Sequence, residues 1–62
     1  MKANELVEKT DRELQELEVQ LRDELFRMRL KHFTGQLQKT SDLRRTRRDI
    51  ARVKTILRQR GA

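Results

Sequence analysis

The sequence has no cysteine, no proline, no tryptophan and no tyrosine, and each absence removes a class of structure or site. Without cysteine, neither a disulfide nor a thiolate metal site can form. A single histidine, His32, gives a closed zinc site no plausible set of ligands. Because proline is absent and glycine occurs only at Gly35 and Gly61, little interrupts a helix. The β-branched and aromatic residues are too scattered for strands, so we predict an all-α chain.

Long apolar runs are also missing. No segment approaches the roughly 20 apolar residues that a membrane-spanning helix requires. The N-terminus carries Lys2 but no apolar core behind it, so it does not resemble a signal peptide. We therefore expect a cytoplasmic protein that is complete as written. Its 62 residues allow one small helical-hairpin domain, residues 1–62, which would gain stability from a partner.

The first long helix is predicted over about residues 10–34. Thr10 and Glu13 have the spacing of a capping box, in which each side chain covers an unpaired backbone N–H at the helix start. Gly35 suits the left-handed conformation that ends many helices. Between these ends, apolar side chains recur every three or four residues along one face: Leu14, Leu17, Leu21, Leu25 and Met28.

A second helix is predicted over about residues 41–60, with Thr40 or Ser41 as its cap. Its apolar face consists of Leu43, Ile50, Val53 and Leu57. The link between the helices, residues 35–39, has Leu37 as an apolar anchor. Because this link is short, the two helices should be antiparallel neighbours. The predicted fold is an antiparallel two-helix hairpin with a short N-terminal helical segment.

The first helix carries a second apolar line, about 140° round from the first on a helical wheel. The residues of this line are Val19, Phe26, Leu30 and Phe33. One partner helix can cover only one of the two lines. The N-terminal segment, through Leu6 and Val7, would fold back over part of the second line. Alternatively Phe26, Leu30 and Phe33 contact another macromolecule, and the two interpretations are compatible.

Charge is distributed unevenly along the chain. Residues 1–33 carry seven basic and eight acidic side chains, a net charge of −1, whereas residues 34–62 carry nine and two, a net charge of +7. Four acid-first pairs at i, i+4 predict a solvated surface on the first helix. These pairs are Glu5–Lys9, Glu8–Arg12, Glu18–Arg22 and Asp23–Arg27. The excess of basic side chains in residues 34–62 instead indicates a polyanionic partner, because like charges repel on an isolated helix.

Catalysis has little support in this sequence. His32 is the only side chain that titrates near neutrality, and it has neither a cysteine nor a carboxylate at helical spacing. Gly35 stands alone, so there is no glycine-rich phosphate loop. A thin hairpin also lacks the concave pocket that a small-molecule site requires. We therefore predict a protein that is not an enzyme, with no cofactor, no metal and no small-molecule substrate.

The basic second helix is typical of a protein that binds nucleic acid by its shape and phosphates. Two phenylalanines are too few to stack successive unpaired bases, and no heptad zipper follows the basic segment. Arginine, whose planar fork holds two phosphate oxygens, suits the exposed backbone of double-helical RNA. A membrane-surface helix is disfavoured, because the apolar face of the second helix has no aromatic residue. The predicted RNA-binding residues are Arg44, Arg47, Arg48, Arg52, Lys54 and Arg58.

Four segments of the chain form a recognisable series: MKANEL at 1–6, TDREL at 10–14, GQL at 35–37 and RRDIARVKTIL at 47–57. In their order and spacing they resemble bacterial large-subunit ribosomal protein L-twenty-nine. The resemblance runs from Met1 to Leu57, and the family signature corresponds to residues 47–55. Phe33 and Thr34 differ from the small residues that relatives often have there.

This resemblance implies an antiparallel helical hairpin that is a structural constituent of the large ribosomal subunit. It implies binding to large-subunit ribosomal RNA near the polypeptide exit tunnel, beside large-subunit ribosomal protein twenty-three. The residue pattern alone leaves another class of protein open. In this alternative, the chain is a helical interaction module that forms a homodimer through Val19, Phe26, Leu30 and Phe33.

Overall fold

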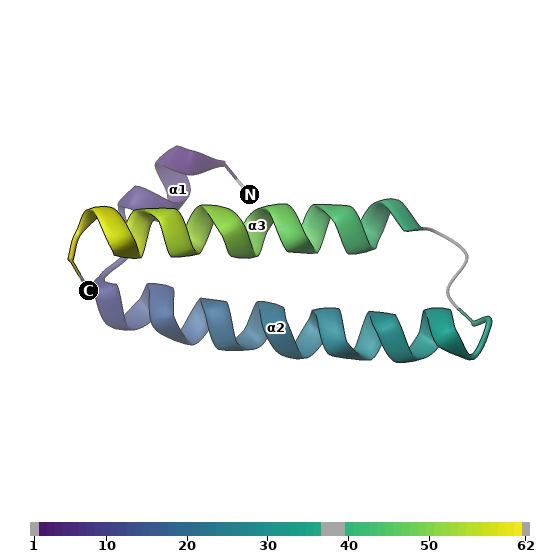
Figure 1. Cartoon of the computed structure of the whole chain (residues 1–62). Coiled ribbons are helices and arrows are strands. Elements are labelled where there is room, and N and C mark those ends of the chain that lie inside the picture. Colours follow the sequence, from purple (N-terminus) through teal and green to yellow (C-terminus); the bar gives the residue numbers. More distant parts are fainter. Residues whose placement is uncertain (1, 37–39, 62) are drawn as a thin grey trace.

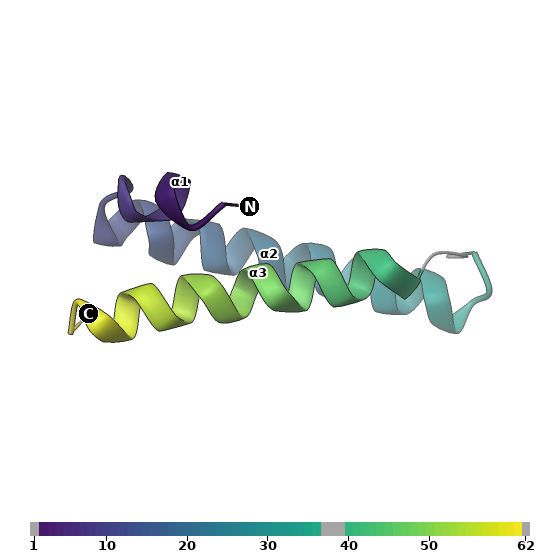
Figure 2. The same ribbon diagram turned by 90° about the horizontal axis from the view of Figure 1, so that it is seen from above.

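The computed structural model describes residues 2–36 and 40–61, and it contains three helices and no strand within these ranges. They are α1 (Ala3–Val7), α2 (Asp11–Phe33) and α3 (Thr40–Gln59). Figure 1 shows α2 and α3 side by side and antiparallel along a molecule of 39 × 17 × 14 Å. Figure 2 shows α1 over the end of this hairpin where α2 begins and α3 ends, and α1 packs against α3. The predicted all-α hairpin with a short N-terminal helix is confirmed.

Both ends of α2 are fixed by local hydrogen bonds. The backbone N–H of Glu13 donates to the Thr10 hydroxyl at 3.2 Å, and the N–H of Thr10 donates to the Glu13 carboxylate at 3.2 Å, which confirms the capping box. These hydrogen bonds, the one from the Thr10 backbone above all, lower the pKa of Glu13. At the other end, Gly35 has φ +79°. Gln36 and Gly35 donate back to the carbonyls of Lys31 and His32, and so close a Schellman motif.

The third helix has one well-defined end. Gly61 has φ +74°, and its N–H donates to the Arg58 carbonyl at 3.1 Å, so glycine again follows the helix. At the start, α3 already includes Thr40 and Ser41. The position that would cap it therefore lies, together with the expected Leu37 anchor, outside the described residues.

The core is a single seam between the helices. Its buried members are Leu6, Leu14, Leu21, Leu25, Ile50, Val53 and Leu57, and Leu17, Leu43 and Ile56 pack against them. Both predicted apolar faces are therefore confirmed except at Met28, which is half-buried and lies outside this core. Thr46 and Asp49 are also buried, which the apolar pattern did not predict. The Thr46 hydroxyl donates to the Asp42 carbonyl at 2.9 Å and lies 3.6 Å from the Met28 sulfur across the seam, so its burial leaves no polar atom unsatisfied.

The second apolar line of α2 stays exposed, so the expectation that the N-terminal segment covers it is wrong. Phe26 is 60% exposed, Leu30 50% and Phe33 89%. Leu6 is buried in the seam instead, at 1% exposure, and Val7 is 55% exposed. The physical reason is that α1 packs against α3, where Leu6 completes a core contributed by three helices. Within the described residues, no helix is both long and apolar enough to span a membrane.

Candidate nucleic-acid interface

The structure places all six predicted RNA-binding residues on α3, and each is exposed. The buried stripe of Ile50, Val53 and Leu57 fixes which way the rest of the helix faces. Arg44 and Arg48, one turn apart, line a shallow depression together with Arg45. Lys54 and Arg58 lie instead beside α2, around a groove that also contacts Glu18. These four residues thus lie in two groups rather than one row, Arg52 lines a further depression beside Arg48, and Arg47 lines none of the three.

Arg45 was missed by the sequence prediction. It lines the same depression as Arg44 and Arg48, so three guanidinium groups gather at the start of α3. The signal was present in the sequence, because Arg45 stands three residues before Arg48, a spacing that makes two side chains neighbours on a helix. We name the exposed cations of α3 the basic face. Its members are Arg44, Arg45, Arg47, Arg48, Arg52, Lys54 and Arg58.

The charges of α2 are mostly neutralised within the helix. Arg22 lies 2.8 Å from Glu18 and Arg27 lies 3.1 Å from Asp23, so two of the four predicted pairs are confirmed. The other two do not form among the described residues, because α1 ends at Val7 and the helix is interrupted between their partners. Arg12 instead pairs with Glu16 at 3.3 Å, within α2.

The charges of the basic face are neutralised far less than those of α2. Within residues 2–36 and 40–61, Arg44, Arg45 and Arg48 form no ion pair. Arg47, Lys54 and Arg58 likewise form no ion pair with a described residue. Arg52 is also exposed, but it has an interaction partner. Only two acidic residues, Asp42 and Asp49, lie on α3, and Asp49 is buried. A rigid helix therefore presents several cations to solvent with little local acid to offset them.

Arg60, just beyond α3, has a structural position that the sequence did not reveal. Its guanidinium donates to the carbonyls of Lys9 at 2.6 Å and Val7 at 2.7 Å, and it pairs with the Asp11 carboxylate at 3.1 Å. These partners span the junction between α1 and α2. Arg60 thus ties the last residues of the hairpin to that junction. It belongs to the fold rather than to the basic face.

No group of histidine or carboxylate side chains suited to a metal ion occurs among the described residues. The remaining surface offers shallow grooves, and their side chains are chiefly cationic and aliphatic. This arrangement can bind an extended anion by charge and by hydrogen bonds from guanidinium groups. Such contacts recognise phosphate oxygens and the shape of a folded nucleic acid rather than a base sequence.

Comparison with known proteins agrees with this geometry. Residues 4–60 match the family model for the ribosomal L29 protein. The large ribosomal subunit protein uL29 of Carboxydothermus hydrogenoformans is 57% identical over 97% of this chain and 87% of that protein. The uL29 protein of Sorangium cellulosum is 52% identical over 98% of this chain and 91% of that protein. The uL29 protein of Natranaerobius thermophilus is 50% identical over 97% of this chain and 92% of that protein. Because both the family model and these relatives cover nearly the whole chain, it belongs to the ribosomal L29 protein family.

Proposed function

We propose that this chain is a structural component of the large ribosomal subunit and binds ribosomal RNA through the basic face of α3. The observation that carries the proposal is the exposed basic face, in which six cations other than Arg52 form no ion pair with any residue that the structure describes. Membership of the ribosomal L29 family supports the same role, which is structural and not enzymatic. The protein would then act in the cytoplasm, as part of the ribosome.

The chemistry of the basic face suits folded RNA. Arg44, Arg45 and Arg48 can each offer a planar fork to two phosphate oxygens of one backbone. Lys54 and Arg58, beside α2, can reach a second stretch of the same RNA. Phosphates of double-helical RNA lie on its outside, where a straight helix with a fixed orientation can contact several of them. Most of the affinity would therefore be electrostatic.

The experiment that tests this function is a titration of the full chain onto large-subunit ribosomal RNA at several salt concentrations. Each neutralised phosphate lowers the slope of log affinity against log salt by about 0.7 to 0.9. Five contacts from the basic face would give a slope of about −4. A slope near zero, or no association with the RNA, would contradict the proposal.

We further propose that the chain lies near the polypeptide exit tunnel, beside large-subunit ribosomal protein twenty-three. This position is supported by the family resemblance. The exposed line of Val19, Phe26, Leu30 and Phe33 is the surface of α2 available for a neighbouring protein. Lysine cross-linking of intact large subunits would test the position. We expect cross-links between this chain and protein twenty-three, and cross-links only to proteins distant from the tunnel would contradict it.

The same exposed line supports one alternative of a different class, a helical module that forms a homodimer. Exposed apolar lines of this length often mark a protein interface. Sedimentation of the isolated chain separates the two functions. The ribosomal function predicts a monomer, whereas a discrete dimer that is lost in Leu30→Ser would favour the alternative.

A further inference from the structure

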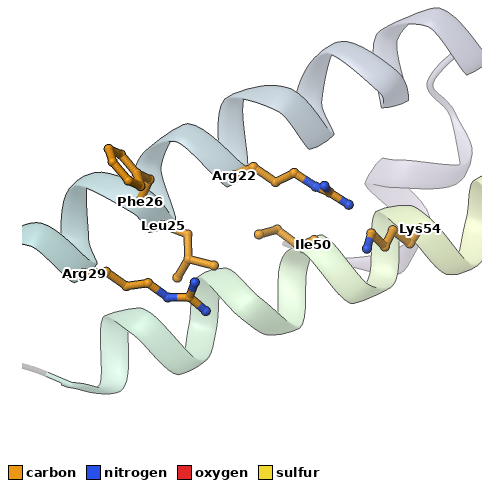
Figure 3. Close-up of a pocket in the computed structure, with 6 residues that line it drawn as sticks. All are labelled: Arg22, Leu25, Phe26, Arg29, Ile50 and Lys54. Atoms are coloured by element: carbon orange, nitrogen blue, oxygen red, sulfur yellow. The ribbon is translucent and has the colours of Figure 1, made fainter.

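A shallow groove of about 400 Å³ runs between α2 and α3, and the basic face borders only one side of it. The groove is lined by Arg22, Leu25, Phe26, Arg29, Ile50 and Lys54. Figure 3 shows Arg22 and Arg29 extending from α2 towards α3, with Leu25 between them. Ile50 and Lys54 lie opposite, on α3. Cations from both long helices therefore surround one apolar floor.

Two of these cations are available to an external anion. Arg22 is held 2.8 Å from the Glu18 carboxylate, which offsets part of its charge. Arg29 and Lys54 are exposed, and neither forms an ion pair with any residue that the structure describes. No acidic side chain lines the groove. The groove thus has a surplus of positive charge on the α2 side, where the charges of the helix are otherwise balanced.

Phe26 adds an aromatic surface to this charge. Phe26 is 60% exposed, and its ring lies on the outer edge of the groove, on the side of α2 away from α3. Arg29 follows three residues later, so the two side chains are neighbours on the helix. An exposed ring beside a phosphate-binding cation is a combination by which proteins hold an unpaired nucleotide, with its base on the ring and its phosphate on the cation.

We propose that this groove binds an unpaired nucleotide of ribosomal RNA. Phe26 stacks on the base, and Arg29 and Lys54 hold the flanking phosphates from the two sides of the groove. The proposal rests on the proposed function, and it extends the RNA interface from α3 to α2. It also divides the exposed apolar line of α2, because Phe26 lines the groove whereas Leu30 and Phe33 do not. One ring provides for a single stacked base.

The charge of the groove would also attract an acidic peptide from a neighbouring protein. The observations favour the nucleotide for two reasons. An acidic side chain would use the cations but leave the ring of Phe26 without a matching surface, whereas a nucleotide uses both. In addition, Lys54 lies on the same helix as the arginines that face the RNA in the proposed function, so one RNA can reach both surfaces.

The test compares single substitutions in the full chain, titrated onto a transcript of the large-subunit ribosomal RNA. Phe26→Leu removes the ring but keeps an apolar side chain, and Arg29→Gln and Lys54→Gln each remove one charge. Phe33→Leu is the matched control for the ring, because Phe33 is exposed but lies outside the groove. Arg27→Gln is the control for charge, because Arg27 pairs with Asp23 and does not line the groove.

We expect Phe26→Leu to weaken binding about fivefold to a hundredfold with an unchanged salt slope, as for the loss of one stacked base. Arg29→Gln and Lys54→Gln should each reduce the magnitude of the salt slope by about 0.7 to 0.9. One unpaired nucleotide should gain 2′-hydroxyl reactivity in Phe26→Leu and not in Phe33→Leu. The controls should bind as wild type, and the thermal melts of all variants should match, because the altered side chains are exposed.

Two results would overturn the groove proposal without touching the proposed function. In one, Phe26→Leu and Arg29→Gln, the two variants outside the basic face, bind RNA as wild type while Arg48→Glu binds weakly. In the other, they bind RNA normally but enter large subunits poorly, so that a protein occupies the groove. If Arg48→Glu also bound RNA as wild type, the proposed function itself would fail.

Discussion

The two long helices bury their apolar faces against each other but differ in what they present to solvent. On α2, five basic side chains accompany six acidic ones, and three ion pairs at i, i+4 neutralise much of the surface. On α3, seven basic side chains accompany two acidic ones, one of which is buried. The packing of the two helices is thus alike, and their outer charge distinguishes them. In the proposed function, the outer charge of α3 binds the RNA, whereas the buried faces of both helices form the core.

The positive charge of α3 destabilises the folded protein in the absence of a partner. Arg44 and Arg48, and again Arg48 and Arg52, stand four residues apart, where like charges destabilise an isolated helix by about 0.2–0.5 kcal/mol for each pair. The i, i+4 pairs of α2 contribute a similar amount in the stabilising direction. A polyanion that binds α3 removes this repulsion and stabilises the folded hairpin by mass action. The free chain should therefore be less stable than the chain in its complex.

The largest expected effect is on the free energy of unfolding, and it concerns the buried apolar faces, in which the two helices are alike. Leu14→Ala on α2 and Leu57→Ala on α3 each truncate a buried side chain. We expect each to lower the free energy of unfolding by about 2–5 kcal/mol, because a cavity remains in a thin core. Leu30→Ala, at a half-exposed position of α2, should change it by less than about 0.5 kcal/mol. Urea unfolding followed by circular dichroism measures all three, and equal losses would mean that the seam is not the core.

Arg60 tests whether every arginine of residues 34–62 acts in RNA binding. Arg60→Gln removes two hydrogen bonds to backbone carbonyls and the ion pair with Asp11. We expect a loss of about 1–2 kcal/mol in unfolding free energy, since hydrogen bonds from a charged donor are stronger than neutral ones. Arg58→Gln is its matched control and should leave the free chain nearly unchanged. If the effects of the two variants on stability were reversed, the structural assignment of Arg60 would be wrong.

The smallest effect concerns the start of α2. Because hydrogen bonds from Thr10 lower the pKa of Glu13 in the folded state, the ionised carboxylate stabilises the fold. This contribution is complete above the ordinary pKa of a glutamate, and it is lost as the pH falls through the lowered pKa. The difference in melting temperature between wild type and Glu13→Gln should therefore shrink as the solution is acidified through that range. A difference that is independent of pH would show that the carboxylate charge does not contribute.

Much of the fold could be predicted from the sequence, because its determinants are local. The capping box at Thr10, the glycine after α2 and the apolar periodicity each depend on residues within one or two turns. The position of α1 could not be predicted, because Leu6 fits either apolar line and only the packing of three helices decides between them. The contacts of Arg60 likewise depend on how the end of α3 aligns with residues about fifty positions away.

For the candidate interface, the sequence predicts the basic helix but not the groove that adjoins it. The excess of arginine on α3 is evident from composition, and the exposed positions follow from the buried stripe. The groove shared with α2 was not predicted, because Arg29 and Lys54 come together only in the register that the seam imposes. Arg29 also looked unremarkable among the balanced charges of the first helix.

The central claim, that the basic face of α3 and not the paired charges of α2 binds ribosomal RNA, is tested most directly by two double variants of equal net charge. Arg44→Gln with Arg48→Gln removes two charges from the basic face, and Arg12→Gln with Arg27→Gln removes two from ion pairs of α2. The measurement is the salt dependence of binding to large-subunit ribosomal RNA. We expect the α3 double variant to bind more weakly, with a slope smaller in magnitude by about 1.4–1.8, and the α2 double variant to match wild type. Equal weakening of the two would contradict the account, because net charge rather than the basic face would then determine binding.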